Sequence, residues 1–153
     1  MGGASVGVNQ SRLDINGSAD LDGSLRVILS PGYSPNPSDV FVILTNKPAQ
    51  MGTFKCLSGI YLLGENKHLN VQYSPAGVAL LTVAAPDPDR VPLSIHAEQG
   101  GFLVCWPEEF TGWLLQHTLT LSPPDWHPQP LTDTSRLYGP ATNAESYYRL
   151  SKP

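Results

Sequence analysis

Proline and glycine recur so often along this chain that they limit what it can fold into. The 153 residues include 15 prolines and 14 glycines, and they punctuate stretches such as SPGYSPNPS at 30–38. Proline breaks helices, and both residues favour turns. No segment shows the i, i+3, i+4 apolar spacing of an amphipathic helix. The sequence therefore predicts an all-β chain of short strands, with 50–67 the one place for a short helical turn.

Alternating or β-branched runs predict where the strands of the first half lie. They cover residues 13–15, 25–29, 39–45, 52–57, 68–73 and 78–83. The run DVFVILT at 39–45 is apolar enough to be buried on both faces.

A proline-rich stretch, AAPDPDRVP at 84–92, divides the chain and is expected to stay extended. It predicts two modules, 1–85 and 92–153, joined by a linker at 86–91. The second module has strand-like runs at 93–96, 102–106, 113–121 and 147–150, with a loose segment ending at Ala144. Alternation places Phe102, Val104 and Trp106 on one face of their strand, and Trp106 is expected in the core.

The charge of the chain excludes some functions. The net charge is −4 and only 14% of residues are charged, so no basic patch is present to bind nucleic acid or anionic lipid. No apolar run reaches the roughly 20 residues of a membrane helix, and the start, MGGASVGVNQSR, lacks the features of a signal peptide. The chain is expected to be part of a longer exported protein. Two separate half-buried thiols, Cys56 and Cys105, are favoured over a disulfide between them.

The second half carries an ordered series of motifs. They are Leu93-Ser94-Ile95, Val104-Cys105-Trp106-Pro107, Gly112-Trp113-Leu114-Leu115-Gln116-His117-Thr118, Leu121-Ser122-Pro123-Pro124-Asp125-Trp126 and Tyr147-Tyr148-Arg149-Leu150. This series resembles the short immunoglobulin/fibronectin-III-like C-terminal modules of large exported proteins in Verrucomicrobia and Planctomycetes. Cys105 departs from that pattern, in which serine is usual. The resemblance implies a small β-sandwich.

The first half is similar, more weakly, to the tails of autotransporter-like or PEP-CTERM-associated β-solenoid proteins. The residues concerned are Leu13-Asp14-Ile15-Asn16-Gly17, Leu21-Asp22-Gly23-Ser24-Leu25, Ser38 to Thr45, Gly52-Thr53-Phe54 and Val71-Gln72-Tyr73. Ser38 stands where that family prefers glycine, so a different turn is expected there. The resemblance implies a β-roll or solenoid-like N-terminal half, packed with the small immunoglobulin-like sandwich, at the end of a secreted or cell-surface protein.

The sharpest catalytic candidate is the cluster Asp125-Trp126-His127. With Ser122 nearby, and Ser135 within reach, it could seed a Ser-His-Asp arrangement in a small secreted hydrolase of esters, lactones or glycosides. No G-x-S-x-G elbow accompanies it, and a plain turn is favoured. The adjacent pair Glu108-Glu109 could supply acid and base carboxylates, but neighbouring side chains in a turn point apart, so a solvated turn is the better interpretation.

Binding candidates are the aromatic residues Trp113, Trp126 and Tyr138, which could line a platform for stacking sugars, although core packing is favoured for large aromatics. Asp20 and Asp22, with Asp14, weakly resemble a calcium loop that lacks its distal ligands. His96, His117 and Cys105 could converge only across strands, and no zinc spacing is present. We therefore expect neither a metal nor a cofactor.

These observations favour a non-catalytic extracellular β-module over an enzyme. Its expected role is structural capping, surface attachment or glycan binding, and the expected partners are a polysaccharide or neighbouring modules of a longer chain. The alternative is the small hydrolase with a site around Asp125 and His127.

Overall fold

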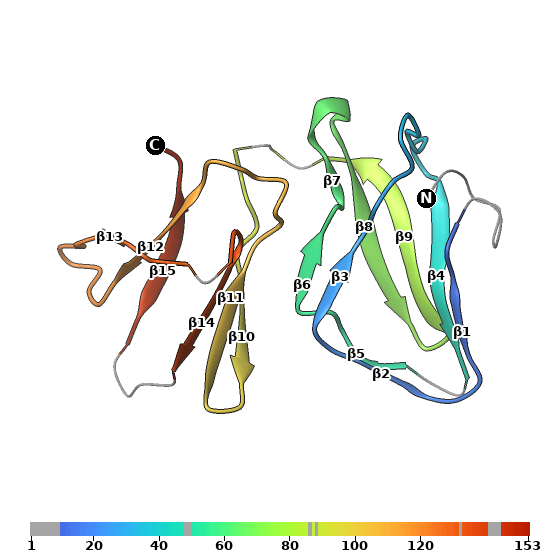
Figure 1. Cartoon of the computed structure of the whole chain (residues 1–153), viewed down its shortest axis with the longest axis horizontal. Helices are drawn as coiled ribbons and strands as arrows, with labels where there is room; N and C mark the ends of the chain where they lie inside the picture. The colour runs from blue at the N-terminus through green and yellow to red at the C-terminus, as the bar shows by residue number, and fades with distance from the viewer. Residues whose placement is uncertain (1–9, 48–49, 86, 88, 132, 141–144) are drawn as a thin grey trace. The chain divides into compact units, whose positions relative to one another are not determined.

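The chain is built almost entirely of β-strands. The computed structural model describes residues 10–47, 50–85, 87, 89–131, 133–140 and 145–153 (Figure 1). These residues form strands β1 to β15 and one short 3-10 helix, η1, at Leu63–Glu65. The all-β prediction is confirmed, and the helical turn lies inside the expected 50–67 segment. No helix in the described part of the chain is long and apolar enough to cross a membrane.

The chain divides into two compact units, Met1–Arg90 and Val91–Pro153. The first unit is organised by a curled five-stranded sheet with the order β1-β4-β9-β8-β7. Its strands are β1 (Leu13–Ile15), β4 (Val40–Asn46), β9 (Gly77–Ala84), β8 (Lys67–Ser74) and β7 (Tyr61–Leu62). Only the β1–β4 pair is parallel.

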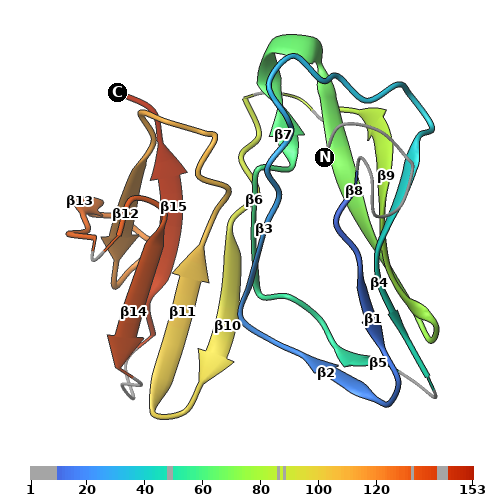
Figure 2. The same cartoon turned by 45° about the vertical axis from the view of Figure 1, so that its right-hand side comes forward.

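Two sets of three strands run side by side in the first unit (Figure 2). We call β1, β2 and β3 the first triplet, and β4, β5 and β6 the second triplet. The remaining strands of these sets are β2 (Ala19–Leu21), β3 (Ser24–Arg26), β5 (Gln50–Gly52) and β6 (Cys56–Ser58). Each strand of the first triplet pairs in parallel with its counterpart in the second, β1 with β4, β2 with β5 and β3 with β6.

The offset along the chain between paired residues is nearly constant, and we call it the triplet spacing. It is the same from Leu13 to its partner Leu44 as from Ala19 to its partner Gln50, and it grows by a single position between β3 and β6. The single strand expected at 52–57 is wrong. Gly52 has a φ of 71° and ends β5, so the chain turns before β6 begins.

An antiparallel hairpin, β8–β9, occupies the other edge of β4. Strand β9 pairs with β4 through a bulge between Val42 and Leu44. The expectation that 39–45 is buried on both faces is wrong, because Val40 and Val42 are 48% and 37% exposed. Only one face of β4 packs against the core, so the apolar composition of 39–45 does not mean that both faces are buried.

The core of the first unit lies between the triplets and this hairpin. Strands from all of them contribute fully or largely buried apolar side chains. The two buried clusters comprise Val27, Phe41, Ile60, Leu69 and Leu80 in one, and Ala19, Leu44 and Val78 in the other. The hairpin therefore closes the core on the side away from the first triplet.

Ser38 keeps a backbone conformation that glycine adopts most easily. Its φ is 70°, and its amide donates to the carbonyl of Thr82 at 2.9 Å. A left-handed φ costs an L-residue about 1–2 kcal/mol. The serine is thus accommodated in a glycine-like turn, at some cost in stability.

Replacing Ser38 with glycine is therefore expected to raise the free energy of unfolding by about 0.5–1 kcal/mol, as measured by urea denaturation. Ser30→Gly is the matched control. Ser30 is not among the described non-glycine residues with positive φ, so its replacement should leave stability unchanged or lower it. Equal effects of the two substitutions would contradict this explanation.

The second unit contains two three-stranded antiparallel sheets. The first has the order β10-β11-β14 and the second β13-β12-β15. The strands are β10 (Ser94–Glu98), β11 (Gly101–Cys105), β14 (Arg136–Pro140), β13 (His127–Pro128), β12 (Leu114–Thr118) and β15 (Tyr147–Ser151). Buried side chains from both sheets, Val104, Leu137 and Leu115, pack with Trp106, so the core position expected for Trp106 is confirmed.

Two expectations for the second unit need correction. Residues 136–140 form β14 and are not loose, because they add an antiparallel strand to β11 from Gly101 to Cys105. The strand expected at 113–121 is shorter, and β12 ends at Thr118. The buried Thr118 hydroxyl donates to the Thr120 carbonyl at 2.9 Å, which turns the chain away from the sheet. Residues 141–144 lie outside the described part.

The expectation that Cys56 and Cys105 are two separate thiols is wrong. Cys56 in β6 and Cys105 at the end of β11 are both buried and both disulfide-bonded. Separation along the chain does not determine whether a cysteine is oxidised, since bond formation depends on where the folded backbone places the sulfur atoms. Disulfides persist mainly in oxidising compartments.

Candidate functional site

Asp125 and His127 form an exposed pair at one end of β12. The Nε2 atom of His127 lies 2.9 Å from Oδ2 of Asp125, and the two side chains are 68% and 80% exposed. The loop before them is organised by Thr118, whose hydroxyl oxygen accepts hydrogen bonds from the amides of Thr120 and Asp125, both at 3.3 Å. Ser122 lies in this loop, preceding a cis peptide bond to Pro123. The structure thus brings together two of the three predicted catalytic residues.

Among the described residues, no hydroxyl or thiol group is hydrogen-bonded to the His127 ring. His127 opens β13 opposite His117 of β12, and within the described residues its ring is hydrogen-bonded only to Asp125. Ser122 is exposed, and its amide donates to the Thr120 hydroxyl at 3.2 Å. Ser135 is buried. Both members of the pair are largely exposed, so neither lies in the low-dielectric setting that typically activates a catalytic histidine.

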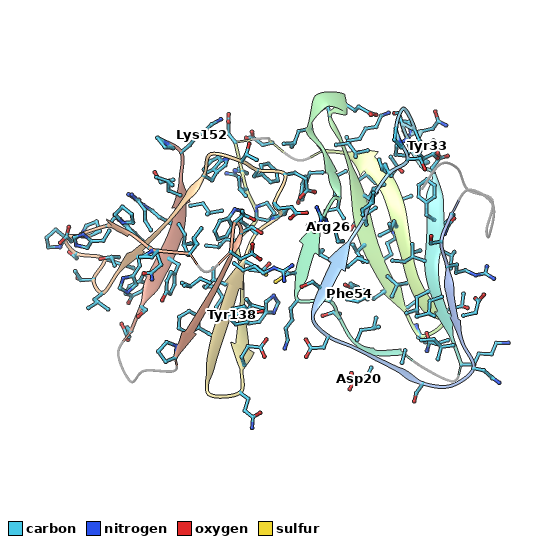
Figure 3. The ribbon with its side chains drawn as sticks, viewed as in Figure 1. Asp20, Arg26, Tyr33, Phe54, Tyr138 and Lys152 are labelled. Atoms are coloured by element: carbon cyan, nitrogen blue, oxygen red, sulfur yellow. The ribbon has the colours of Figure 1, made fainter. Side chains whose placement is uncertain are left out.

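The aromatic binding candidates do not form one platform. Trp126 is half-buried, and the guanidinium carbon of Arg149 lies 4.3 Å from the centre of its ring. Arg149 is fixed there by donating from Nε to the side-chain oxygen of Gln116 at 2.8 Å. A cation–π contact of this kind occupies one face of the indole. Tyr138 is 58% exposed but belongs to the other sheet, on β14 (labelled in Figure 3). Trp113 is half-buried, directly before β12.

The acidic residues of the weak calcium candidate already have partners. Asp22 forms an ion pair with Lys55 at 2.8 Å and accepts from the Gly23 amide at 2.6 Å. Asp14 is held by Arg12, with 2.8 Å between Nε and Oδ1. Asp20 lies on β2 and is exposed (Figure 3). The described residues contain no group of three or more histidine, cysteine, aspartate or glutamate side chains that could hold a metal ion.

The other polar candidates are also dispersed. His96 lies on β10 opposite Leu103, whereas His117 lies on β12 opposite Tyr148, in a different sheet. Glu108 and Glu109 are half-buried and not solvated as expected, because the turn that carries them includes the buried Phe110. The two histidines therefore lie in different sheets, and the two glutamates share one turn.

The feature that the sequence did not reveal is a cavity of about 500 Å³ in the first unit. It is mainly apolar. Its lining comes from both triplets, from the residues just before β1 and just after β3, and from the segment between β5 and β6. Among the lining residues are Leu13, Leu25, Val27, Ile43, Leu44 and Phe54 (Phe54 is labelled in Figure 3). Leu13 is 57% exposed, so the cavity is open to solvent beside β1. A repeated sequence motif could have predicted the paired triplets that line this cavity. The paired segments Leu13-Asp14-Ile15 and Leu44-Thr45-Asn46, however, share only their first residue.

The pairing between β1 and β4 is reinforced outside the core. Asp14 and Thr45 are paired across the two strands, and the Thr45 hydroxyl donates to the Asp14 carboxylate. This hydrogen bond, followed by one from Arg12, holds the pKa of Asp14 below its usual value of 3.8. The ionised carboxylate is thus the form that stabilises the parallel pair.

Asp14→Asn is therefore expected to lower the melting temperature at neutral pH but not in strong acid. A carboxyl whose pKa is lower in the folded state contributes stability that is fully present above its unfolded pKa and is lost as pH falls through the folded pKa. The difference in melting temperature from the parent should be constant above about pH 5 and vanish towards about pH 2. Thr45→Val, which removes the main donor, should flatten the same pH dependence. A difference in melting temperature between parent and Asp14→Asn that is the same at neutral pH and in strong acid would contradict this role of Asp14.

Comparison of the chain with protein-family models, with curated proteins and with solved structures found no match. The function therefore has to be inferred from the arrangement of its strands and side chains.

Proposed function

We propose that this chain is a non-catalytic structural module of an exported protein, and that its first unit closes the end of a parallel β-solenoid. In this proposal each triplet is one coil of the solenoid, and the second unit is a small immunoglobulin-like sandwich that follows the cap. The observation that carries the proposal is the near-constant triplet spacing across three successive parallel strand pairs. Parallel stacking of successive coils at a fixed spacing is the organising rule of solenoids.

The β8–β9 hairpin supports the capping role. It pairs antiparallel with the edge of β4 that a further parallel coil would need, and its buried residues Leu69, Val78 and Leu80 cover the core on that side. A terminal element that differs from the repeating coils is what prevents unlimited stacking in repeat proteins. The position of the hairpin thus supports its role as the element that prevents a further parallel coil from pairing with β4.

The cysteines support an exported location. Both are disulfide-bonded, and such bonds are rare in reducing cytoplasm. A secreted or cell-surface setting fits this chemistry, and it fits the resemblance of both halves to modules of exported bacterial proteins.

The hydrolase alternative and the glycan-binding role have less support. Among the described residues, no nucleophile is hydrogen-bonded to the His127 ring of the exposed Asp125–His127 pair. The ring of Trp126 is covered on one face by Arg149. Capping is therefore the role that we favour among those expected from the sequence.

A fusion experiment tests the capping role. The whole chain is joined to a regular parallel β-solenoid whose own end cap has been deleted, so that β1 follows the last host coil. The uncapped host is expected to associate end to end, whereas the fusion should be monomeric by size-exclusion chromatography with light scattering. A matched fusion carrying Leu80→Asp, which disrupts the buried face of the hairpin, should associate again. Association of the intact fusion to the same extent as the uncapped host would rule out capping.

A further inference from the structure

The outer edges of β1 and β2 face the same end of the first unit. Strand β1 is the outermost strand of its sheet, and β2 pairs only with β5 among the described strands. Both strands use their other edge for a parallel partner at the same triplet spacing, so their outer backbone groups point away from the second triplet. An edge of this kind is a template for adding another strand.

The apolar cavity opens at this same end. It is lined by Leu13 and Leu25 of the first triplet as well as by Leu44 of the second, and the 57% exposure of Leu13 marks its mouth. Edge strands and an open apolar interior therefore occur together, on the side opposite the β8–β9 hairpin. The partner that fits has to supply both strand edges and apolar side chains.

We propose that this open end receives one further coil of parallel strands, supplied by a preceding part of a longer polypeptide, because the triplet spacing places the strand that pairs with Leu13 ahead of Met1. The inference rests on the proposed capping function and names its partner. The incoming coil pairs in parallel with β1 and then with β2, and it precedes each of them by the triplet spacing that separates β1 from β4 and β2 from β5. Its inward apolar side chains fill the cavity beside Leu13 and Leu25.

The chain direction favours a preceding coil over other occupants. In the chain, β3 of the first triplet is followed by a connection that leads into β4 of the second triplet. A preceding coil would lead into β1 through a connection of the same kind. A single added strand would pair with one edge and leave the turn towards β2 uncovered. A small apolar ligand would fill the cavity but would satisfy no backbone group.

A second copy of the chain is a poorer fit. The β8–β9 hairpin occupies the edge of β4, so two copies cannot stack head to tail in parallel. Copies meeting through their open ends would bring the exposed carboxylates of Asp14 and Asp20 towards their own counterparts, and like charges facing each other across strands are destabilising.

The side chains that pair with Asp14 and Asp22 indicate what the outward face of the coil should carry. Thr45 donates a hydrogen bond to Asp14, and Lys55 pairs with Asp22 at 2.8 Å. Hydroxyl or basic side chains beside these acidic positions therefore suit a neighbouring coil, whereas the positions beside Leu13 and Leu25 suit large apolar side chains.

An added coil tests the proposal directly. A duplicate of residues 10–40, a segment whose length equals the triplet spacing, is inserted ahead of Gln10 in the full-length chain. Hydrogen–deuterium exchange is then followed by mass spectrometry in peptides covering β1 and β2. We expect the exchange of their amides to slow by at least about tenfold compared with the parent chain. The fluorescent probe 1-anilinonaphthalene-8-sulfonate, which reports exposed apolar cavities, should bind the parent and bind the extended chain much more weakly.

The matched control is the same insertion with the duplicated Leu13, Ile15 and Leu25 changed to aspartate, which should give no protection and leave probe binding at the level of the parent. Protection that is equal in the extended chain and in this control would overturn the proposal. So would unchanged exchange in the extended chain with undiminished probe binding, which would mark the cavity as a ligand site. Protection of β1 in the parent that rises with concentration, together with dimers in light scattering, would assign the surface to a second copy. The Leu80→Asp fusion reports on the β8–β9 hairpin, whereas this exchange experiment reports on the edges of β1 and β2. Protection of β1 and β2 in the extended chain, together with association of the intact fusion, would reject capping alone. Lack of protection in the extended chain would reject the added coil.

Discussion

Replacing Gly59 with alanine is expected to lower the free energy of unfolding of the first unit by about 3–5 kcal/mol. Gly59 has a φ of 70°, and an added Cβ atom would lie 1.8 Å from the carbonyl oxygen of Val27. Gly59 follows β6 and Val27 follows β3, so the clash forces apart the two triplets where they are paired. Neither the backbone of Gly59 nor that of Val27 can move without breaking this pairing.

Gly23→Ala separates the clash from the backbone conformation. Gly23 has almost the same φ, 71°, but no atom lies within 4 Å of its added Cβ. Its replacement should therefore cost only the conformational penalty of about 1–2 kcal/mol. Urea denaturation followed by far-ultraviolet circular dichroism gives both values. Equal losses for the two variants would mean that the close approach of the triplets at Gly59 is not as described.

Phe41→Ala is expected to cost about 3–5 kcal/mol, the usual range for removing a buried aromatic side chain. Phe41 is fully buried, with 0% exposure, among Val27, Leu69 and Leu80. Its ring also meets that of Tyr33 edge to face, with the ring centres 6.4 Å apart. The cavity left by alanine lies where the second triplet, the β8–β9 hairpin and the segment after β3 meet, so all three lose contacts.

Val42→Ala is the matched control for Phe41→Ala. Val42 directly follows Phe41 along β4 and is 37% exposed, so its truncation should cost less than about 1 kcal/mol. Circular dichroism is the appropriate probe because all three tryptophans belong to the second unit, and their fluorescence would report on the wrong core. A cost for Phe41→Ala no larger than that for Val42→Ala would show that β4 faces the core differently.

The strands that could be predicted from sequence are those whose own pattern specifies them. Strands β8, β9 and β11 are among the longer ones and have alternating or β-branched character, and all three were predicted. Strands β2, β5 and β13 are much shorter. Such short segments are extended because they pair with distant partners, so no local pattern marks them.

The candidate site shows the same division between local and long-range information. The proximity of Asp125 and His127 follows from their closeness in the sequence. The contact of Arg149 with Trp126 could not be predicted, because it depends on how β12 and β15 pair. The triplet spacing could not be predicted from the sequence for another reason. Parallel pairing constrains backbone position and side-chain direction, but not residue identity, so Ala19-Asp20-Leu21 can pair with Gln50-Met51-Gly52 without sequence similarity.

The triplet spacing also has a consequence for the order of folding. The β8–β9 hairpin is joined by the short turn at Pro75-Ala76, and hairpins of this kind close within microseconds. Each parallel pair between the triplets closes a much longer loop and has a higher entropic barrier. The hairpin is therefore expected to form first and to offer β9 as the edge on which β4 assembles, with β1 added last. If the hairpin is the proposed cap, the element that ends the stack of parallel strands would also be the first element to fold.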